Sequence, residues 1–153
     1  MRRGFTLIEL MVVVAISAVV MSGGIAAYRG FADKYQIKQA GSEFQTNLKL
    51  FQRKAMSGEK PTECLGGFEG IRVRRIDASN YAFQAQCGTV DGDEQIIALP
   101  EGTIFNTANF DLFFATLNSA VTGAQTVEIT ATGSVNIYEV IIEANGVIKG
   151  GLQ

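Results

Sequence analysis

An uncharged apolar run lies near the start of the chain. Residues 10–28, between Glu9 and Arg29, contain no charged side chain. A helix needs about 20 apolar residues to cross a bilayer. The pattern therefore predicts one membrane-spanning helix with the carboxylate of Glu9 at its front edge. A carboxylate in such a place is costly unless a positive group neutralises it, which makes Glu9 a candidate functional residue.

The helical pattern continues beyond the apolar run. From residue 31 onward the apolar positions are Phe31, Ile37, Ala40, Phe44, Leu48, Phe51 and Ala55. The later ones recur every three or four residues, which predicts one face of an amphipathic helix. Gly58 is a suitable C-terminal cap, and Pro61 follows soon after it. We therefore expect a single helix over residues 5–57, about 80 Å long at ~1.5 Å per residue.

After residue 60 the apolar positions change to a period of two. Residues 71–74, 81–87 and 127–131 alternate between apolar and polar side chains and predict half-buried antiparallel strands. Asn145-Gly146, between two further apolar segments, predicts a hairpin with a type I′ turn. The expected fold class is α+β, with a long N-terminal helix packed on a C-terminal antiparallel β-sheet domain.

Charge is divided unevenly along the chain. Residues 1–58 carry eight Lys or Arg and three Asp or Glu, whereas residues 59–153 carry five and twelve. An acidic domain disfavours nucleic acid as a partner, although Arg72, Arg74 and Arg75 could form a small basic spot for DNA. The chain has no histidine, which removes the usual general base and most metal sites. With no nucleophile or phosphate-loop pattern either, we do not expect an enzyme.

The two cysteines, Cys64 and Cys87, both fall in the C-terminal part. Outside the cytoplasm they would form a disulfide, and in the cytosol they would be free buried thiols. Two thiolates without histidine make a poor zinc site. The segment Asp91-Gly92-Asp93-Glu94 could present oxygens to calcium, but its spacing is not that of an EF-hand. We therefore expect no cofactor.

Residues 4–9 read Gly-Phe-Thr-Leu-Ile-Glu directly before the apolar run. This combination resembles the prepilin signature of type IV pilins and type II secretion pseudopilins. The resemblance implies that a prepilin peptidase cuts between Gly4 and Phe5 and methylates the new N-terminus at Phe5. Residues 1–4 would be the leader, 5–28 the transmembrane and filament-core helix, 29–58 its amphipathic second half, and 59–153 the β-rich globular domain.

The C-terminal third carries a second, weaker resemblance. Phe113 and Phe114 lead one strand, residues 126–130 form another, and residues 138–148 form a strand, an Asn-Gly turn and a strand. This order resembles the β-domain of H-type minor pseudopilins and related minor pilins.

The prepilin resemblance also implies a function and a location. The chain would cross the inner membrane once and would then be polymerised by an inner-membrane assembly platform. Homologous pilin or pseudopilin subunits would be its partners, in a cell-surface pilus or a periplasmic pseudopilus. Glu9 of an incoming subunit would pair with the amine of Phe5 in its neighbour. The alternatives are an uncleaved, monomeric membrane-anchored binding module, with Glu9 solvated at the interface, or a minor pilin in DNA uptake.

Overall fold

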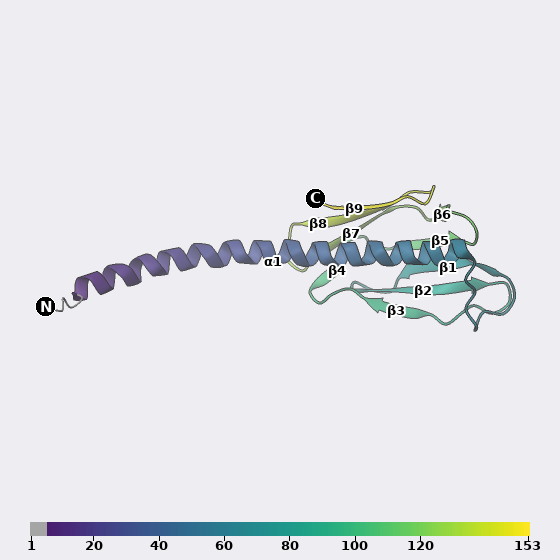
Figure 1. Cartoon of the computed structure of the whole chain (residues 1–153), viewed down its shortest axis with the longest axis horizontal. Coiled ribbons are helices and arrows are strands. Elements are labelled where there is room, and N and C mark those ends of the chain that lie inside the picture. Colours follow the sequence, from purple (N-terminus) through teal and green to yellow (C-terminus); the bar gives the residue numbers. More distant parts are fainter. Residues whose placement is uncertain (1–5) are drawn as a thin grey trace. The chain divides into compact units, whose positions relative to one another are not determined.

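The computed structural model describes residues 6–153, and the side chains of residues 22–30 lie outside the description. The chain divides into two compact units, Met1–Lys34 and Tyr35–Gln153, and each is described by itself. One helix, α1 (Leu7–Ser57), contributes to both units (Figure 1). The predicted long helix is therefore confirmed over its described residues.

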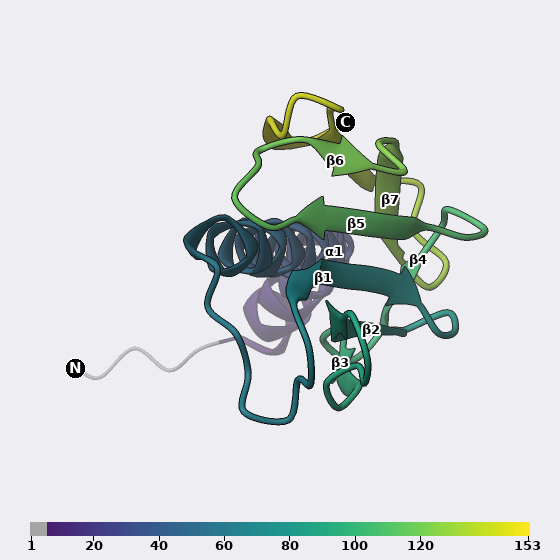
Figure 2. The same cartoon turned by 90° about the vertical axis from the view of Figure 1, so that its right-hand side faces the viewer.

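The second unit is a β-domain that includes the last part of α1. Its described strands are β1 (Phe68–Arg75), β2 (Asn80–Cys87), β3 (Gln95–Ala98), β4 (Thr103–Phe105), β5 (Asp111–Ala115), β6 (Val121–Thr122), β7 (Thr126–Ala131), β8 (Ile137–Ile142) and β9 (Ile148–Leu152). They form a five-stranded sheet in the order β3-β2-β1-β5-β6 and a four-stranded sheet in the order β4-β7-β8-β9. Figure 2 shows the strands of the first sheet following one another across the domain. The α+β class is confirmed, but the domain has two antiparallel sheets where the pattern predicted one.

The apolar face of α1 within the second unit forms the centre of the core. Six of the residues that the helical spacing singled out are buried, namely Ile37, Ala40, Phe44, Leu48, Phe51 and Ala55. The ring of Phe44 lies 5.0, 5.3 and 5.6 Å from the rings of Tyr81, Phe105 and Phe110, measured between centroids. Removal of this apolar surface from water is the main favourable contribution to the packing of α1 on the sheets.

Phe31, the first apolar position after the uncharged run, is not part of this face. Its side chain is 74% exposed. Phe31 belongs to the first unit, where all described side chains are exposed. Phe31 lies six positions before Ile37, and residues six apart do not share a helix face, which is set by spacings of three and four.

The C-terminal end of α1 is capped as predicted. Gly58 has a φ of +65°, a conformation that only glycine adopts readily. Its N–H donates to the carbonyl of Ala55 at 3.1 Å, and the N–H of Glu59 donates to the carbonyl of Lys54 at 3.3 Å. This pair of bonds is a Schellman motif, which satisfies carbonyls left without a partner in the last turn.

The predicted hairpin at Asn145-Gly146 joins β8 to β9, but its turn is not of type I′. Gly146 has a φ of +90°, whereas Asn145 does not take a positive φ. The N–H of Gly146 donates to the carbonyl of Glu143 at 2.9 Å, and the N–H of Val147 donates to the side-chain oxygen of Asn145 at 3.0 Å. The loop is therefore the three-residue kind, with glycine at its left-handed position.

Gly41 allows the ring of Tyr138, on β8, to lie against the backbone of α1. A Cβ at position 41 would meet three atoms of that ring at 2.1, 2.3 and 2.7 Å. On β9, a Cβ at position 150 would lie 2.8 Å from the same ring. The ring therefore lies between two positions that have room for glycine alone.

We expect Gly41→Ala to lower the free energy of unfolding by about 2–3 kcal/mol through overpacking. Alanine favours a helix over glycine by about 1 kcal/mol, so intrinsic propensity alone predicts the opposite sign. Urea unfolding of a soluble fragment of residues 30–153, which contains every residue of the core cluster, measures the change. Ser42→Ala is the matched control, because Ser42 is the exposed neighbour, and it should shift stability by less than about 0.5 kcal/mol. A Gly41→Ala fragment of normal stability would contradict the tight contact with Tyr138.

Candidate processing and assembly site

The first turn of α1 holds Glu9 in a capping box with Thr6. The N–H and the hydroxyl of Thr6 both donate to Oε2 of Glu9, at 2.9 and 2.8 Å. In return, the N–H of Glu9 donates to the hydroxyl oxygen of Thr6 at 3.3 Å. A Thr followed three residues later by Glu satisfies N–H groups that the start of a helix leaves without partners. The carboxylate of Glu9 is therefore bound within its own chain.

This local partner of Glu9 is a feature that the sequence prediction missed. The signal was present, because Thr-x-x-Glu before an apolar run is the signature of a capping box. Glu9 was instead singled out by the cost of a carboxylate beside apolar residues. Gly4 and Phe5, predicted to flank the cleavage site, lie outside the described residues.

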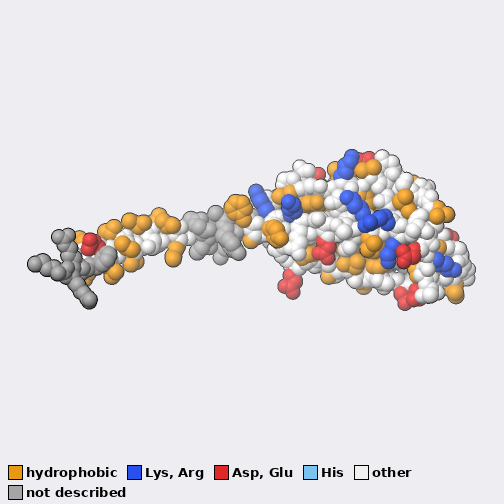
Figure 3. Space-filling view, viewed as in Figure 1, with side chains coloured by type: hydrophobic (Ala, Val, Ile, Leu, Met, Phe, Trp, Pro, Cys, Tyr) orange, Lys and Arg blue, Asp and Glu red, His pale blue; other side chains and the backbone are white. Residues whose placement is uncertain are grey.

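The helix that follows Thr6 presents apolar side chains to its surroundings. Between Leu7 and Met21, the large hydrophobic side chains are 53–73% exposed, and Figure 3 shows them as orange side chains along this part of the helix. A helix that is apolar all round is normally buried in a membrane or in a protein core. A continuous apolar surface of this kind marks an interaction site.

The membrane span predicted for residues 10–28 is not confirmed. In the described part of the chain, no helical stretch combines the length and the apolarity needed to cross a membrane. The side chains of residues 22–28 lie outside the description.

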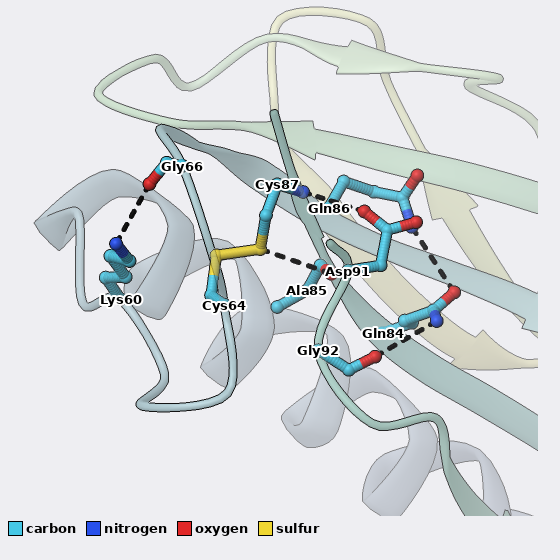
Figure 4. The surroundings of a disulfide bond; sticks show 9 residues. All are labelled: Lys60, Cys64, Gly66, Gln84, Ala85, Gln86, Cys87, Asp91 and Gly92. Atoms are coloured by element: carbon cyan, nitrogen blue, oxygen red, sulfur yellow. Dashed lines mark hydrogen bonds between the residues drawn. A yellow bond between two sulfur atoms is a disulfide. The ribbon is translucent and has the colours of Figure 1, made fainter. Parts of the chain in front are cut away.

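Cys64 and Cys87 form a disulfide at one end of the β-domain, as predicted for an exported chain. Their Cα atoms are 5.8 Å apart, and Figure 4 shows the bond joining the loop before β1 to the end of β2. The two residues are separated by 23 positions. Closing a loop of this size stabilises the folded state by about 3 kcal/mol in the chain-entropy account.

The acidic turn beside the disulfide uses its carboxylates for structural hydrogen bonds. Oδ1 of Asp91 accepts the backbone N–H of Cys87 at 2.8 Å (Figure 4). Oε1 of Glu94 accepts a hydrogen bond from Nε of Arg74 at 2.8 Å. In the described part of the chain, no three acidic, cysteine or histidine side chains come together as a metal site would require. Asp91 and Glu94 therefore each accept a hydrogen bond within their own domain.

The three arginines of β1 are engaged within the β-domain. Arg72 forms a two-point contact with Asp111, with Nε 2.8 Å from Oδ1, and this hydrogen bond holds the pKa of the Asp111 carboxyl below its usual range. Arg74 pairs with Glu94. Arg75 donates to backbone carbonyls of residues 77, 107 and 108. Each guanidinium of the suggested DNA-binding spot is therefore matched by oxygens of its own domain.

The alternation over residues 81–87 places Ala82 on the same face of β2 as the polar Gln84 and Gln86, but Ala82 is fully buried. It lies opposite Arg74 in the pairing of β1 with β2. The side chains of Arg72, Arg74 and Glu94 surround it on the outer face of the sheet. Alternation of apolar and polar residues predicts which face a side chain takes, but it does not show that a neighbouring ion pair covers a small residue.

Amide side chains on both flanks of the buried helix face bind the β-domain. Gln45 and Gln52 donate to carbonyls of the β8–β9 hairpin, at Ile148 and Gly146, over 3.3 and 2.7 Å. On the other flank, Asn47 donates to the hydroxyl of Tyr81 at 2.8 Å. Burial raises the pKa of Tyr81 to about 12. These contacts fix the helix on the sheets, and the spacing of apolar residues gave no sign of them.

Comparison with known proteins agrees with the N-terminal pattern. Residues 1–25 match the family described as the prokaryotic N-terminal methylation motif. The chain carries this methylation motif. The resemblance of residues 4–9 to type IV pilins is therefore confirmed at the level of the motif.

Two similar proteins are type IV major fimbrial proteins FimA from Dichelobacter nodosus. One is 31% identical over 73 residues, which cover 48% of this chain and 47% of the relative. The other is 32% identical over 91 residues, which cover 60% and 56%. The chain thus spans about half the length of these relatives, and no solved structure matched it. Neither the motif nor the relatives are those of an enzyme, in agreement with the prediction that the chain is not an enzyme.

Proposed function

We propose that this chain is the structural subunit of a type IV pilus. One observation carries the proposal: the methylation motif at residues 1–25 includes the start of α1, whose large apolar side chains between Leu7 and Met21 are exposed on all sides. In a monomer in water this apolar surface would remain exposed to solvent, which is unfavourable. A filament of many copies buries it between subunits. The resemblance to fimbrial proteins supports a pilus over a type II secretion pseudopilus.

Assembly would proceed in a defined order. The precursor is held in the inner membrane by residues 5–28 and loses its leader, residues 1–4, through cleavage between Gly4 and Phe5. Methylation of Phe5 leaves an amine that still carries its proton. Residues 29–58 support the β-rich domain, residues 59–153, on the filament surface. The carboxylate of Glu9 then meets the amine of a neighbouring copy in the filament core.

Intact-mass measurement of the full chain tests this proposal. The chain is expressed with a prepilin peptidase and an assembly platform, and the sheared surface fraction is compared with the membrane fraction. We expect sheared filaments whose subunit lacks residues 1–4 and carries one added methyl group. A peptidase-deficient strain is the control and should yield the precursor in the membrane alone. An uncleaved chain and an empty sheared fraction in the complete strain would instead support a monomeric anchored module.

A further inference from the structure

The exposed side of α1 in the second unit carries cations without ion-pair partners. Lys38, Lys49 and Arg53 are exposed there at helical spacing, opposite the buried face; we call these three residues the cationic helix surface. The ion pairs formed by the described residues are Arg72–Asp111, Arg74–Glu94 and Lys149–Glu143, and none involves this surface. Figure 3 shows blue side chains following α1 where it crosses the β-domain.

The acidic excess of the β-domain is concentrated around the disulfide. Residues 58–69 and 88–93 contain five carboxylates and one cation, Lys60, and the five are the exposed residues Glu59, Glu63, Glu69, Asp91 and Asp93. Lys60 donates to the carbonyl of Gly66 at 2.9 Å (Figure 4). The disulfide and the bridge between Leu65 and Val90 hold these segments together. We call these five carboxylates the acidic disulfide end, and none of them takes part in the ion pairs of the described chain.

We propose that the cationic helix surface of one copy of this chain binds the acidic disulfide end of a second copy. The two surfaces have opposite charge, and neither is neutralised within its own molecule by an ion pair of the described residues. Because they are different surfaces, the contact is heterologous, and a heterologous contact whose rotation does not close into a ring adds copies in an open series, as a filament requires. This inference rests on the proposed pilus function and identifies the part of the globular domain that meets its neighbour.

DNA and an anionic membrane would also attract a cationic helix surface, but they would repel the acidic end. A second copy uses both surfaces at once, which is why we favour it. Single exposed ion pairs contribute little to stability. Charge complementarity nevertheless selects partners strongly, because like charges placed against one another are penalised. Charge reversal is therefore a sharper test than neutralisation.

The test uses the full chain in an assembling strain, with filament measured in the sheared fraction and mature subunit in the membrane. Lys49→Glu with Arg53→Glu reverses the helix surface, and Glu63→Lys with Asp93→Lys reverses the acidic end. We expect each pair of changes to lower filament yield at least about tenfold, because both create like-charge contacts. All four changes in one chain should restore yield to within about threefold of the original, because opposite charges then meet again.

Two controls separate this effect from misfolding and from net charge. Each variant should retain the Cys64–Cys87 disulfide and a normal membrane pool. Lys149→Glu with Glu143→Gln, outside both surfaces, adds negative charge without placing two carboxylates together and should assemble normally. Normal assembly by either reversed variant, or failure of the fourfold variant, would overturn the proposal. Loss of assembly after reversal of the helix surface, together with normal assembly after reversal of the acidic end, would point to DNA or lipid. Absence of filaments from the unmodified chain would instead refute the pilus function itself.

Discussion

Phe44→Ala should lower the free energy of unfolding of residues 30–153 by about 4 kcal/mol. Phe44 is fully buried, and its ring contacts the rings of Tyr81, Phe105 and Phe110. Alanine would remove the apolar surface and leave a cavity, and both effects destabilise the fold. Loss of the edge-to-face ring contacts would add to this cost, since such pairs contribute about 0.5–1.5 kcal/mol each.

Phe31→Ala is the matched control for this prediction. Phe31 lies six residues before Ile37, the first buried residue of the helix face, and it is 74% exposed. Its replacement in the same fragment should change stability by less than about 0.5 kcal/mol. Urea titration followed by circular dichroism measures both variants, with the m-value as a check on two-state unfolding. Equal destabilisation by the two changes would contradict the boundary between the buried and exposed parts of α1.

Much of the fold was predictable because it depends on local pattern. The spacing of Ile37, Phe44 and Leu48 identified the buried helix face, and Gly58 identified its end. These signals lie within a few residues of one another. The division of the strands into two sheets was not predictable, because strand pairing joins segments far apart in the sequence. The contact of Gly41 with Tyr138 is of the same kind, since the need for glycine comes from a ring on another element.

Features of the candidate site also divide into those that a local sequence pattern predicts and those that depend on contacts between distant segments. The motif at residues 4–9 and the disulfide between Cys64 and Cys87 were both found from sequence. The hydrogen bonds of Thr6 with Glu9 follow from a four-residue signature and could have been found. The pairing of Arg72 with Asp111 could not, because it depends on β1 lying beside β5. Such pairs give Arg72 and Arg74 acidic partners within their own domain.

Glu9→Ala should abolish or sharply reduce filament assembly while leaving membrane insertion and processing intact. In the proposed filament core, water is excluded and the amine of Phe5 has Glu9 as its counter-charge. Removing one partner of a buried pair costs about 3–5 kcal/mol, because the other charge stays buried without compensation. Insertion should survive, since alanine makes the segment more apolar. We expect at least about a tenfold loss of sheared filament, with a mature membrane pool close to that of the unmodified chain.

The capping box supplies the decisive control for this prediction. Glu9 also accepts two hydrogen bonds from Thr6, so Glu9→Ala alone would confuse loss of charge with loss of a helix cap. Glutamine can take the place of glutamate in a capping box, and Glu9→Gln therefore keeps the cap while removing the charge. Thr6→Ala does the reverse, at a cost of about 1 kcal/mol to the helix start. If filament assembly requires the charge of Glu9, Glu9→Gln should form as few filaments as Glu9→Ala, and Thr6→Ala should still form filaments. Normal filament yield from Glu9→Gln, expressed without any unmodified subunit, would show that Glu9 acts as a cap rather than as a counter-charge.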